Sequence, residues 1–225
     1  MVLRLVGCLV AGVLLAGGVV AGPDLLAERN GDFKKGLEFW QIDFPKHDFL
    51  KNNKSFVSIT SDSGRNNVLK FALDQNLADN QGVQALSYPI RIDPDKRYKL
   101  TVSARSTGPW GRIYVMGKRW KPGVKKHSNP SNDETRDAFK GPVISFKGEK
   151  GTAQFSYVKP TWSTASVEIP QRDMSKLAYS FWENCDFVVV HLVGIAGKAG
   201  DFYVSDVKLE EIGQIDKSKI AAKKK

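Results

Sequence analysis

The sequence predicts an all-β protein in which two antiparallel sheets pack as a sandwich, with one or two short helices on loops. Three observations support this class: short runs rich in β-branched and aromatic residues recur along the chain, apolar and polar residues alternate within them, and turn residues separate them. The runs 56–60 and 68–73 show all three features, with Ser-Asp-Ser-Gly between them. Alternating βαβ units would instead need long helical segments between the strands.

The remaining elements are predicted by the same features along the chain. Pro94 holds the backbone angle that the second position of a turn requires, so residues 93–96 predict an antiparallel hairpin. Helical patterns are confined to 131–139, where Ser131 and Glu134 have the spacing of a capping box, and to 173–179. The other predicted strands are 83–92, 98–105, 112–116, 143–146, 153–158, 166–169, 187–193 and 201–209.

The first 21 residues predict a secretory signal: Arg4 is followed by an apolar run and by small residues before the cleavage position Ala21-Gly22. A retained membrane anchor is the alternative, but glycines interrupt the apolar run and no stop-transfer flank follows it. We therefore expect an exported protein with no membrane span in the mature chain. The expected organisation is a signal at 1–21, one sandwich domain at 22–212 and a basic flexible tail at 213–225.

The charge of the chain limits the kinds of binding partner, and its cysteine content limits disulfide formation. The formal net charge is +10, and five of the lysines lie in the last nine residues. This tail is either a solvated end or a contact for polyanions, and export argues against nucleic acid as the partner. After signal removal Cys185 is the only cysteine, so no intramolecular disulfide can form. Because an apolar run follows it, we expect Cys185 to be buried and unreactive.

Three segments, in chain order, carry a resemblance to a known family. Residues 30–33 read Asn-Gly-Asp-Phe and precede Gly36, Leu37 and Trp40; residues 82–105 include Pro94, Tyr98, Leu100 and Arg105; residues 202–209 read Phe-Tyr-Val-Ser-Asp-Val-Lys-Leu. These segments resemble the exported jelly-roll carbohydrate-binding modules with a galactose-binding-like fold. The resemblance spans residues 25–209 and implies a two-sheet jelly roll that binds a glycan across one sheet or at the loop rim.

The same resemblance implies a structural calcium ion near the first and last strands, with Asp32 and Asp206 as the candidate metal ligands. The sequence departs from the family at two positions, since Lys34 replaces the usual glutamate and Ser205 replaces an aspartate. A lysine next to the ion would oppose calcium binding electrostatically. The other interpretation is that Asp32 serves a turn and Asp206 faces solvent. No cofactor is required by any motif in the chain.

A carbohydrate site needs an aromatic ring to stack on the sugar and planar polar groups to bond its hydroxyls. The segment 110–120 supplies Trp110, Arg112, Tyr114 and Trp120, and on an extended strand Arg112 and Tyr114 share one face. Alternation in the run 188–193 places His191 where it could face a groove. The competing interpretation is that these rings pack in the core or anchor a loop, and that His191 is satisfied by packed neighbours.

The sequence therefore favours non-catalytic binding of a carbohydrate. The long connection predicted at 118–141 is basic in its first half, which favours an anionic polysaccharide as a hypothesis from charge alone. A structural or protein-interaction module of the cell envelope on the same fold is the alternative. A polysaccharide-degrading enzyme is less favoured, since His47, His127 and His191 lie far apart and no H-E-x-x-H or G-x-S-x-G motif occurs. The oligomeric state is not predicted.

Overall fold

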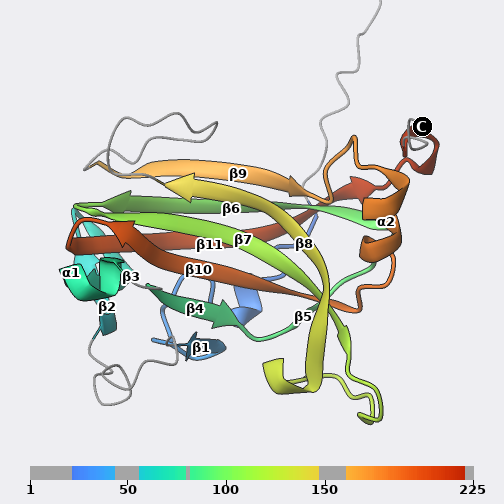
Figure 1. Cartoon of the computed structure of the whole chain (residues 1–225), viewed down its shortest axis with the longest axis horizontal. Coiled ribbons are helices and arrows are strands. Elements are labelled where there is room, and N and C mark those ends of the chain that lie inside the picture. Colours follow the sequence, from blue (N-terminus) through green and yellow to red (C-terminus); the bar gives the residue numbers. More distant parts are fainter. Residues whose placement is uncertain (1–21, 44–55, 80–81, 147–160, 221–225) are drawn as a thin grey trace, which may run out of the picture.

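A computed structural model describes residues 22–43, 56–79, 82–146 and 161–220. The predicted signal 1–21, the predicted strand 153–158 and His47 lie outside the described residues. Within the described part, two antiparallel sheets face each other, with strands distant in sequence lying next to one another (Figure 1). The predicted all-β jelly-roll sandwich with short helices on loops is confirmed.

The sheets contain six and five strands. In the six-stranded sheet the order is β1-β4-β10-β7-β8, with β5 pairing β10. In the five-stranded sheet the order is β2-β3-β11-β6-β9. The first sheet comprises β1 (Trp40–Asp43), β4 (Val83–Ser87), β5 (Ile90–Arg91), β7 (Pro109–Trp120), β8 (Thr135–Phe146) and β10 (Phe187–Gly197). The second comprises β2 (Val57–Asp62), β3 (Arg65–Leu73), β6 (Lys96–Ser106), β9 (Ser163–Ile169) and β11 (Gly200–Gln214).

The core lies between the sheets and follows the period-two alternation of the strands. Phe71 and Phe202 are directly opposite on β3 and β11 of the five-stranded sheet and stack on its inner side with ring centroids 5.8 Å apart, and Phe146 of the six-stranded sheet meets Phe202 across the core at 6.2 Å. Gly111 faces the same ring, because a Cβ at that position would lie 2.1 Å from the Phe202 ring. Glycine is therefore required at this point of β7 for the sheets to approach each other.

Two helices, α1 (Gln75–Asp79) and α2 (Lys176–Trp182), lie at opposite ends of the sandwich (Figure 1). The helix α2 corresponds to the helix predicted at 173–179 and begins after Ser175, whose Oγ accepts the Ala178 N–H at 3.2 Å. The prediction of a helix at 131–139 is wrong. Its capping box is present, but one 3₁₀ turn, Asn132–Glu134, satisfies it, and Thr135 already begins β8. The pairing of the twelve-residue strand β8 with β7 stabilises the extended conformation more than the cap stabilises a helix.

The β7–β8 connection is shorter than the sequence indicates. β7 continues to Trp120 and β8 starts at Thr135, so the connection comprises residues 121–134 in place of 118–141. The last strand also runs past the expected end of the domain, since β11 reaches Gln214 and the Ile215 N–H donates to the Asp95 carbonyl at 2.8 Å. Residues up to 220 thus remain attached to the sandwich by described contacts.

The first described residues run beside the end of β11. The Gly22 N–H donates to the Glu211 carbonyl at 2.8 Å, and the Leu25 N–H donates to the Leu209 carbonyl at 2.8 Å. The Asp24 carboxylate in turn accepts the Leu209 N–H at 3.0 Å. Both ends of the described domain therefore meet at one strand of the five-stranded sheet. No helix in the described ranges is long and apolar enough to cross a membrane.

Candidate ligand-binding face

The outer face of the six-stranded sheet carries most of the predicted ligand-binding residues. On β7, Ile113 and Val115 are fully buried in the core, so Arg112 and Tyr114 project from the opposite side. On β10, His191 alternates with core residues in the same way. We call this surface the β7–β10 face and define it by Trp110, Arg112, Tyr114, Lys118 and His191, with Gln84 of β4 and Asp137 and Lys140 of β8.

A stacked pair of rings forms the centre of this face. Tyr114 and His191 are directly opposite in the β7–β10 register, and their ring centroids lie 4.7 Å apart with an interplanar angle of 17°. The Lys140 Nζ lies 5.7 Å from the Tyr114 centroid. Burial raises the pKa of Tyr114, so its hydroxyl stays protonated and able to donate at neutral pH. The sheet thus holds an aromatic pair beside a cation in a fixed geometry.

His191 has unused hydrogen-bonding capacity. Its side chain is 8% exposed, its Nδ1 lies 3.4 Å from the Gln84 Oε1, and its buried Nε2 has no partner among the described residues. Burial, followed by the charge of Lys118, lowers its pKa to about 4, with Asp137 acting in the opposite direction. The imidazole is therefore neutral at pH 7, where one ring nitrogen donates and the other accepts.

Trp110 and Arg112 extend the face along β7 toward its start. Trp110 is half-buried and lies against the backbone of Gly197, where a Cβ would come within 2.9 Å of the ring. Arg112 is exposed and stands between Val193 on β10 and Ser145 on β8. At roughly 3.3 Å of rise per residue, the side chains from Trp110 to Lys118 cover about 26 Å. This length accommodates several sugar rings.

Trp120 does not belong to this surface as a ligand contact. The side chain is only 7% exposed and meets Phe187 and His127 edge-on, with ring centroids 5.3 and 5.2 Å away. A ring enclosed in this way cannot stack on a sugar, and it anchors the connection 121–134 to the sheet instead. Its burial removes Trp120 from the set of ligand contacts that the sequence predicts.

The candidate calcium ligands do not fit a calcium site. The Asp32 carboxylate pairs with the Lys34 Nζ at 2.6 Å, and that contact lowers the pKa of Asp32. The Asp206 carboxylate pairs with Arg65. Among the described residues, no group of three or more His, Cys, Asp or Glu side chains could hold a metal ion. Calcium prefers several carboxylate and carbonyl oxygens without a competing cation, so these two side chains offer it a poor environment.

Asn30 satisfies backbone hydrogen-bonding groups of the first loop. The buried Asn30 amide donates to the carbonyls of Gly36 and Glu38 at 3.0 and 3.1 Å, and its Oδ1 accepts the Lys35 N–H at 2.9 Å. The Trp40 indole donates to the Asn30 carbonyl at 3.0 Å. Asn30 adopts a left-handed conformation with φ of 58°, which asparagine tolerates better than most residues. The loop carbonyls therefore bind an amide group of the chain itself.

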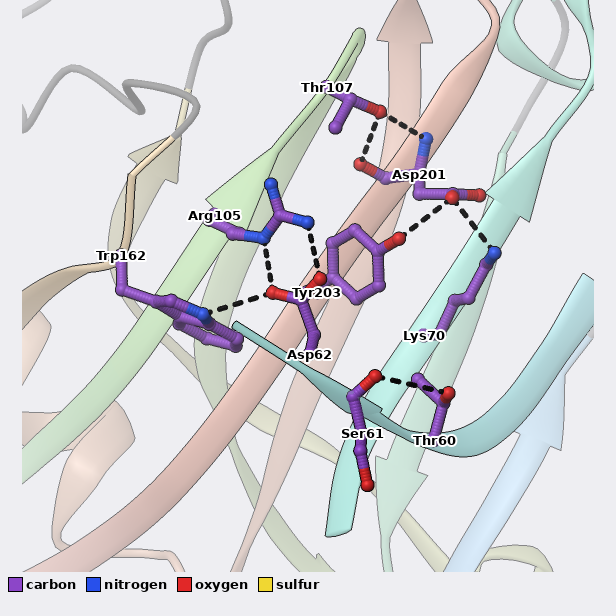
Figure 2. A network of polar contacts seen from close by, with 9 residues as sticks. All are labelled: Thr60, Ser61, Asp62, Lys70, Arg105, Thr107, Trp162, Asp201 and Tyr203. Atoms are coloured by element: carbon purple, nitrogen blue, oxygen red, sulfur yellow. Dashed lines mark hydrogen bonds and ion pairs between the residues drawn. The ribbon is translucent and has the colours of Figure 1, made fainter. Parts of the chain in front are cut away.

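The outer face of the five-stranded sheet carries a polar network that sequence reasoning missed (Figure 2). Asp62 accepts two hydrogen bonds from Arg105 and one, at 3.1 Å, from the Trp162 indole. The Arg105 guanidinium lies 4.5 Å from the Tyr203 centroid, and the Tyr203 hydroxyl donates to Asp201 at 2.8 Å. Each of these charges is paired within the network, which locks the tip of the β2–β3 hairpin onto β6.

Comparison with known proteins adds a structural resemblance. No model of a known protein family matches the chain, and no curated protein matches it. Carbohydrate-binding modules are prominent among the solved structures that the chain resembles.

Three of these structures illustrate the kinds of protein and the degree of similarity. A xylan-binding domain from Paenibacillus barcinonensis has a TM-score of 0.47 at 8% identity, covering 86% of this chain and 97% of its own. A family 11 carbohydrate-binding module from Clostridium thermocellum, in complex with a mixed-linked tetrasaccharide, has a TM-score of 0.42 at 16% identity and coverages of 82% and 94%. A Stig cyclase from a Fischerella species has a TM-score of 0.48 at 12% identity and coverages of 87% and 98%. With TM-scores below 0.5, none of them assigns a function to this chain.

Proposed function

We propose that this protein is an exported, non-catalytic module that binds a glycan across the β7–β10 face. The observation that carries the proposal is the Tyr114 ring, held against the buried His191 at the centre of a sheet face that also presents Trp110 and Arg112. Aromatic rings suit the apolar CH faces of sugars, and guanidinium and amide groups suit their hydroxyls. His191 is only 8% exposed, so its role is to position Tyr114. Export rests on the predicted signal at 1–21.

The floor of the face supports the same interpretation. Leu86, Val189 and Val193 point outward from the six-stranded sheet, because their strand neighbours belong to the core between the sheets. They give the face an apolar base beneath the polar side chains. Binding sites for small ligands combine an apolar lining with a few oriented polar groups in this way. Because all of these residues lie on paired strands, little ordering would accompany binding.

The charge of the face favours an acidic glycan, such as a uronate-containing polymer. Lys118 pairs with Asp137, whereas neither Arg112 nor Lys140 pairs with a described carboxylate. A guanidinium that is free of a protein carboxylate can bind the carboxylate of a sugar through two parallel hydrogen bonds. We therefore expect an acidic polysaccharide to bind more tightly than its neutral counterpart.

The proposal is tested on a glycan array of neutral and acidic polysaccharides, in calcium and in chelator, followed by titration calorimetry with the best ligand. Tyr114→Ala should weaken binding at least about tenfold, which corresponds to roughly 1.4 kcal/mol. Phe181→Ala is the matched control, because it removes an exposed ring from α2 and should leave the affinity unchanged. Silence on every glycan, or equal affinities of Tyr114→Ala and the parent protein, would contradict the proposal.

One observation favours protein interaction as the second candidate function. Leu177 and Phe181 lie four residues apart on α2 and are 58% and 51% exposed. Residues at this spacing share one face of a helix and form an apolar patch at the end of the sandwich. Loss of a protein contact in Phe181→Ala together with a silent glycan array would favour this function over glycan binding.

A further inference from the structure

Two arginines face each other at the far end of the β7–β8 hairpin. Arg119 and Arg136 are directly opposite in the strand register, which brings their Cβ atoms to about 4.5–5.5 Å. Like charges at directly opposite positions destabilise a strand pair. One position earlier, Lys118 is neutralised by Asp137 on the partner strand. By contrast, no side-chain hydrogen bond or ion pair joins Arg119 or Arg136 to another described residue.

Arg119 also has an unsatisfied donor. Its Nε is buried and has no hydrogen-bond partner in the part of the chain that the structure describes. A buried guanidinium N–H without an acceptor is unfavourable, because burial removes water without replacing its hydrogen bond. A guanidinium presents five donors in a planar fork and has no acceptor of its own. Any group that binds this guanidinium must therefore supply oxygen lone pairs.

A solvent-open hollow lies next to this arginine. It is bounded by the start of the β7–β8 connection and by the residues that follow α2, and it includes Arg119, Lys121, Lys126, Asn184, Glu183 and Asp186 among its lining residues. We call it the hairpin hollow. Asp186 already accepts the Trp120 backbone N–H at 3.4 Å. The lining carries the cations Arg119, Lys121 and Lys126 and the acids Glu183 and Asp186, so positive side chains outnumber negative ones in the hollow.

We propose that the hairpin hollow binds an oxyanion group, the sulfate ester or carboxylate of an acidic polymer, with Arg119 of its lining as the main ligand. Arg136 does not line the hollow, but it lies directly opposite Arg119 on β8 and would bind the same group from the rim. Such a group offers two coplanar oxygens to the guanidinium fork, and it would also screen the repulsion between the two arginines. The site is separate from the β7–β10 face. Arg119 lies between Lys118 and Trp120 on β7 and therefore points to the opposite side of the hairpin from them. Arg136, its register partner on β8, shares that side.

The test follows the side-chain Nε–Hε resonances of arginine by ¹H–¹⁵N NMR while sodium sulfate or sodium glucuronate replaces sodium chloride at constant ionic strength. We expect one buried arginine resonance, absent in Arg119→Gln, to shift saturably with at least one of the two anions. Arg136→Gln should raise the dissociation constant about tenfold or more, in keeping with the loss of a charged hydrogen bond. The anion that binds more tightly identifies the preferred group.

Matched variants separate this site from general charge effects and from the glycan face. Arg172→Gln removes an exposed arginine that pairs with Glu168 at 3.0 Å, and it should leave anion binding unchanged. Tyr114→Ala should also bind the anion as the parent does, so failure of the glycan proposal would leave this result intact. In chloride, Arg136→Gln should melt at the same temperature as the parent or higher, since it relieves a repulsion. Linear, unsaturated shifts with both anions, or equal dissociation constants in Arg136→Gln and the parent, would overturn the proposal.

Discussion

Breaking the lock between Asp62 and Arg105 from one side should cost several kcal/mol of stability. Their side chains are 12% and 13% exposed, and Asp62 accepts two bonds from Arg105 as well as one from Trp162 (Figure 2). Removing one partner of a buried pair typically costs about 3–5 kcal/mol. Asp62→Asn keeps the shape and removes the charge, and Asp201 still compensates Arg105 in part. We therefore expect a loss of about 3 kcal/mol.

Urea and thermal unfolding at pH 7 measure this loss. A change of about 3 kcal/mol lowers the melting temperature by roughly 6–12 °C in a domain of this size. The control is Glu211→Gln, which breaks the more exposed pair with Lys96, whose side chain is 29% exposed; it should cost less than about 1 kcal/mol. If Asp62→Asn cost no more than the control, or a double-mutant cycle with Arg105→Gln gave no coupling, the assignment of a stabilising lock would be refuted.

Acid titration gives an independent check of the same pair. The hydrogen bonds from Arg105 lower the pKa of Asp62 below its usual value of 3.8. A carboxylate with a lowered pKa in the folded state stabilises the fold above its unfolded pKa, and this stabilisation is lost as the pH falls below it. The difference in unfolding free energy between the parent and Asp62→Asn should therefore be constant near neutral pH and shrink below about pH 4.

Three further outcomes are expected. The imidazole of His191 should titrate near pH 4 by NMR, and a titration near 6.5 would contradict its burial. Because its folded pKa lies below the unfolded value of 6.5, the free energy of unfolding should fall progressively between about pH 6.5 and pH 4, and it should fall less in His191→Gln. Gly111→Ala should lose at least about 2 kcal/mol in urea unfolding, because its Cβ would meet the Phe202 ring, whereas a neutral result would show that the sheets can separate at that point. Cys185, whose pKa burial raises to about 12, should react with a thiol reagent only in the unfolded protein, and reaction in the folded state would show that it is accessible.

Sequence periodicity predicts most of the described strands and the faces of β7, but not β1 or the first half of β8. Alternation around Ile113 and Val115 placed Arg112 and Tyr114 on the outer side, where the structure has them. The alternation of β10 placed His191 on one side of its strand in the same way. Periodicity could not give the order of the strands in the sheet, since pairing depends on distant contacts. The partnership of Tyr114 with His191, 77 positions along the chain, arises only because β7 lies next to β10.

The errors have equally specific causes. Ser131 and Glu134 form a real capping box, but a cap specifies only a first turn, and pairing with β7 makes the residues from Thr135 onward a strand. Trp120 is a residue type that often stacks on sugars, but Phe187 and His127 enclose its ring. The spacing of these residues in the sequence gives no sign that they lie near it. The network around Asp62 draws on separate strands and strand ends that are distant in sequence, so no local motif could have indicated it.

The meeting of the two described ends at β11 has a consequence for how the module could be joined to other proteins. Gly22 and Leu25 bond to the end of β11, and the chain leaves the sheet just beyond Gln214. Both exits therefore belong to the five-stranded sheet, whereas Tyr114 stands on the outer side of the six-stranded one. Lys217, just past β11, pairs with Asp95 and contacts Tyr179 of α2, so a fusion partner or surface tether attached at either end would lie at the end of the sandwich that carries α2. Immobilisation through one end should accordingly leave the β7–β10 face uncovered along the side of the sandwich, open to a long polymer.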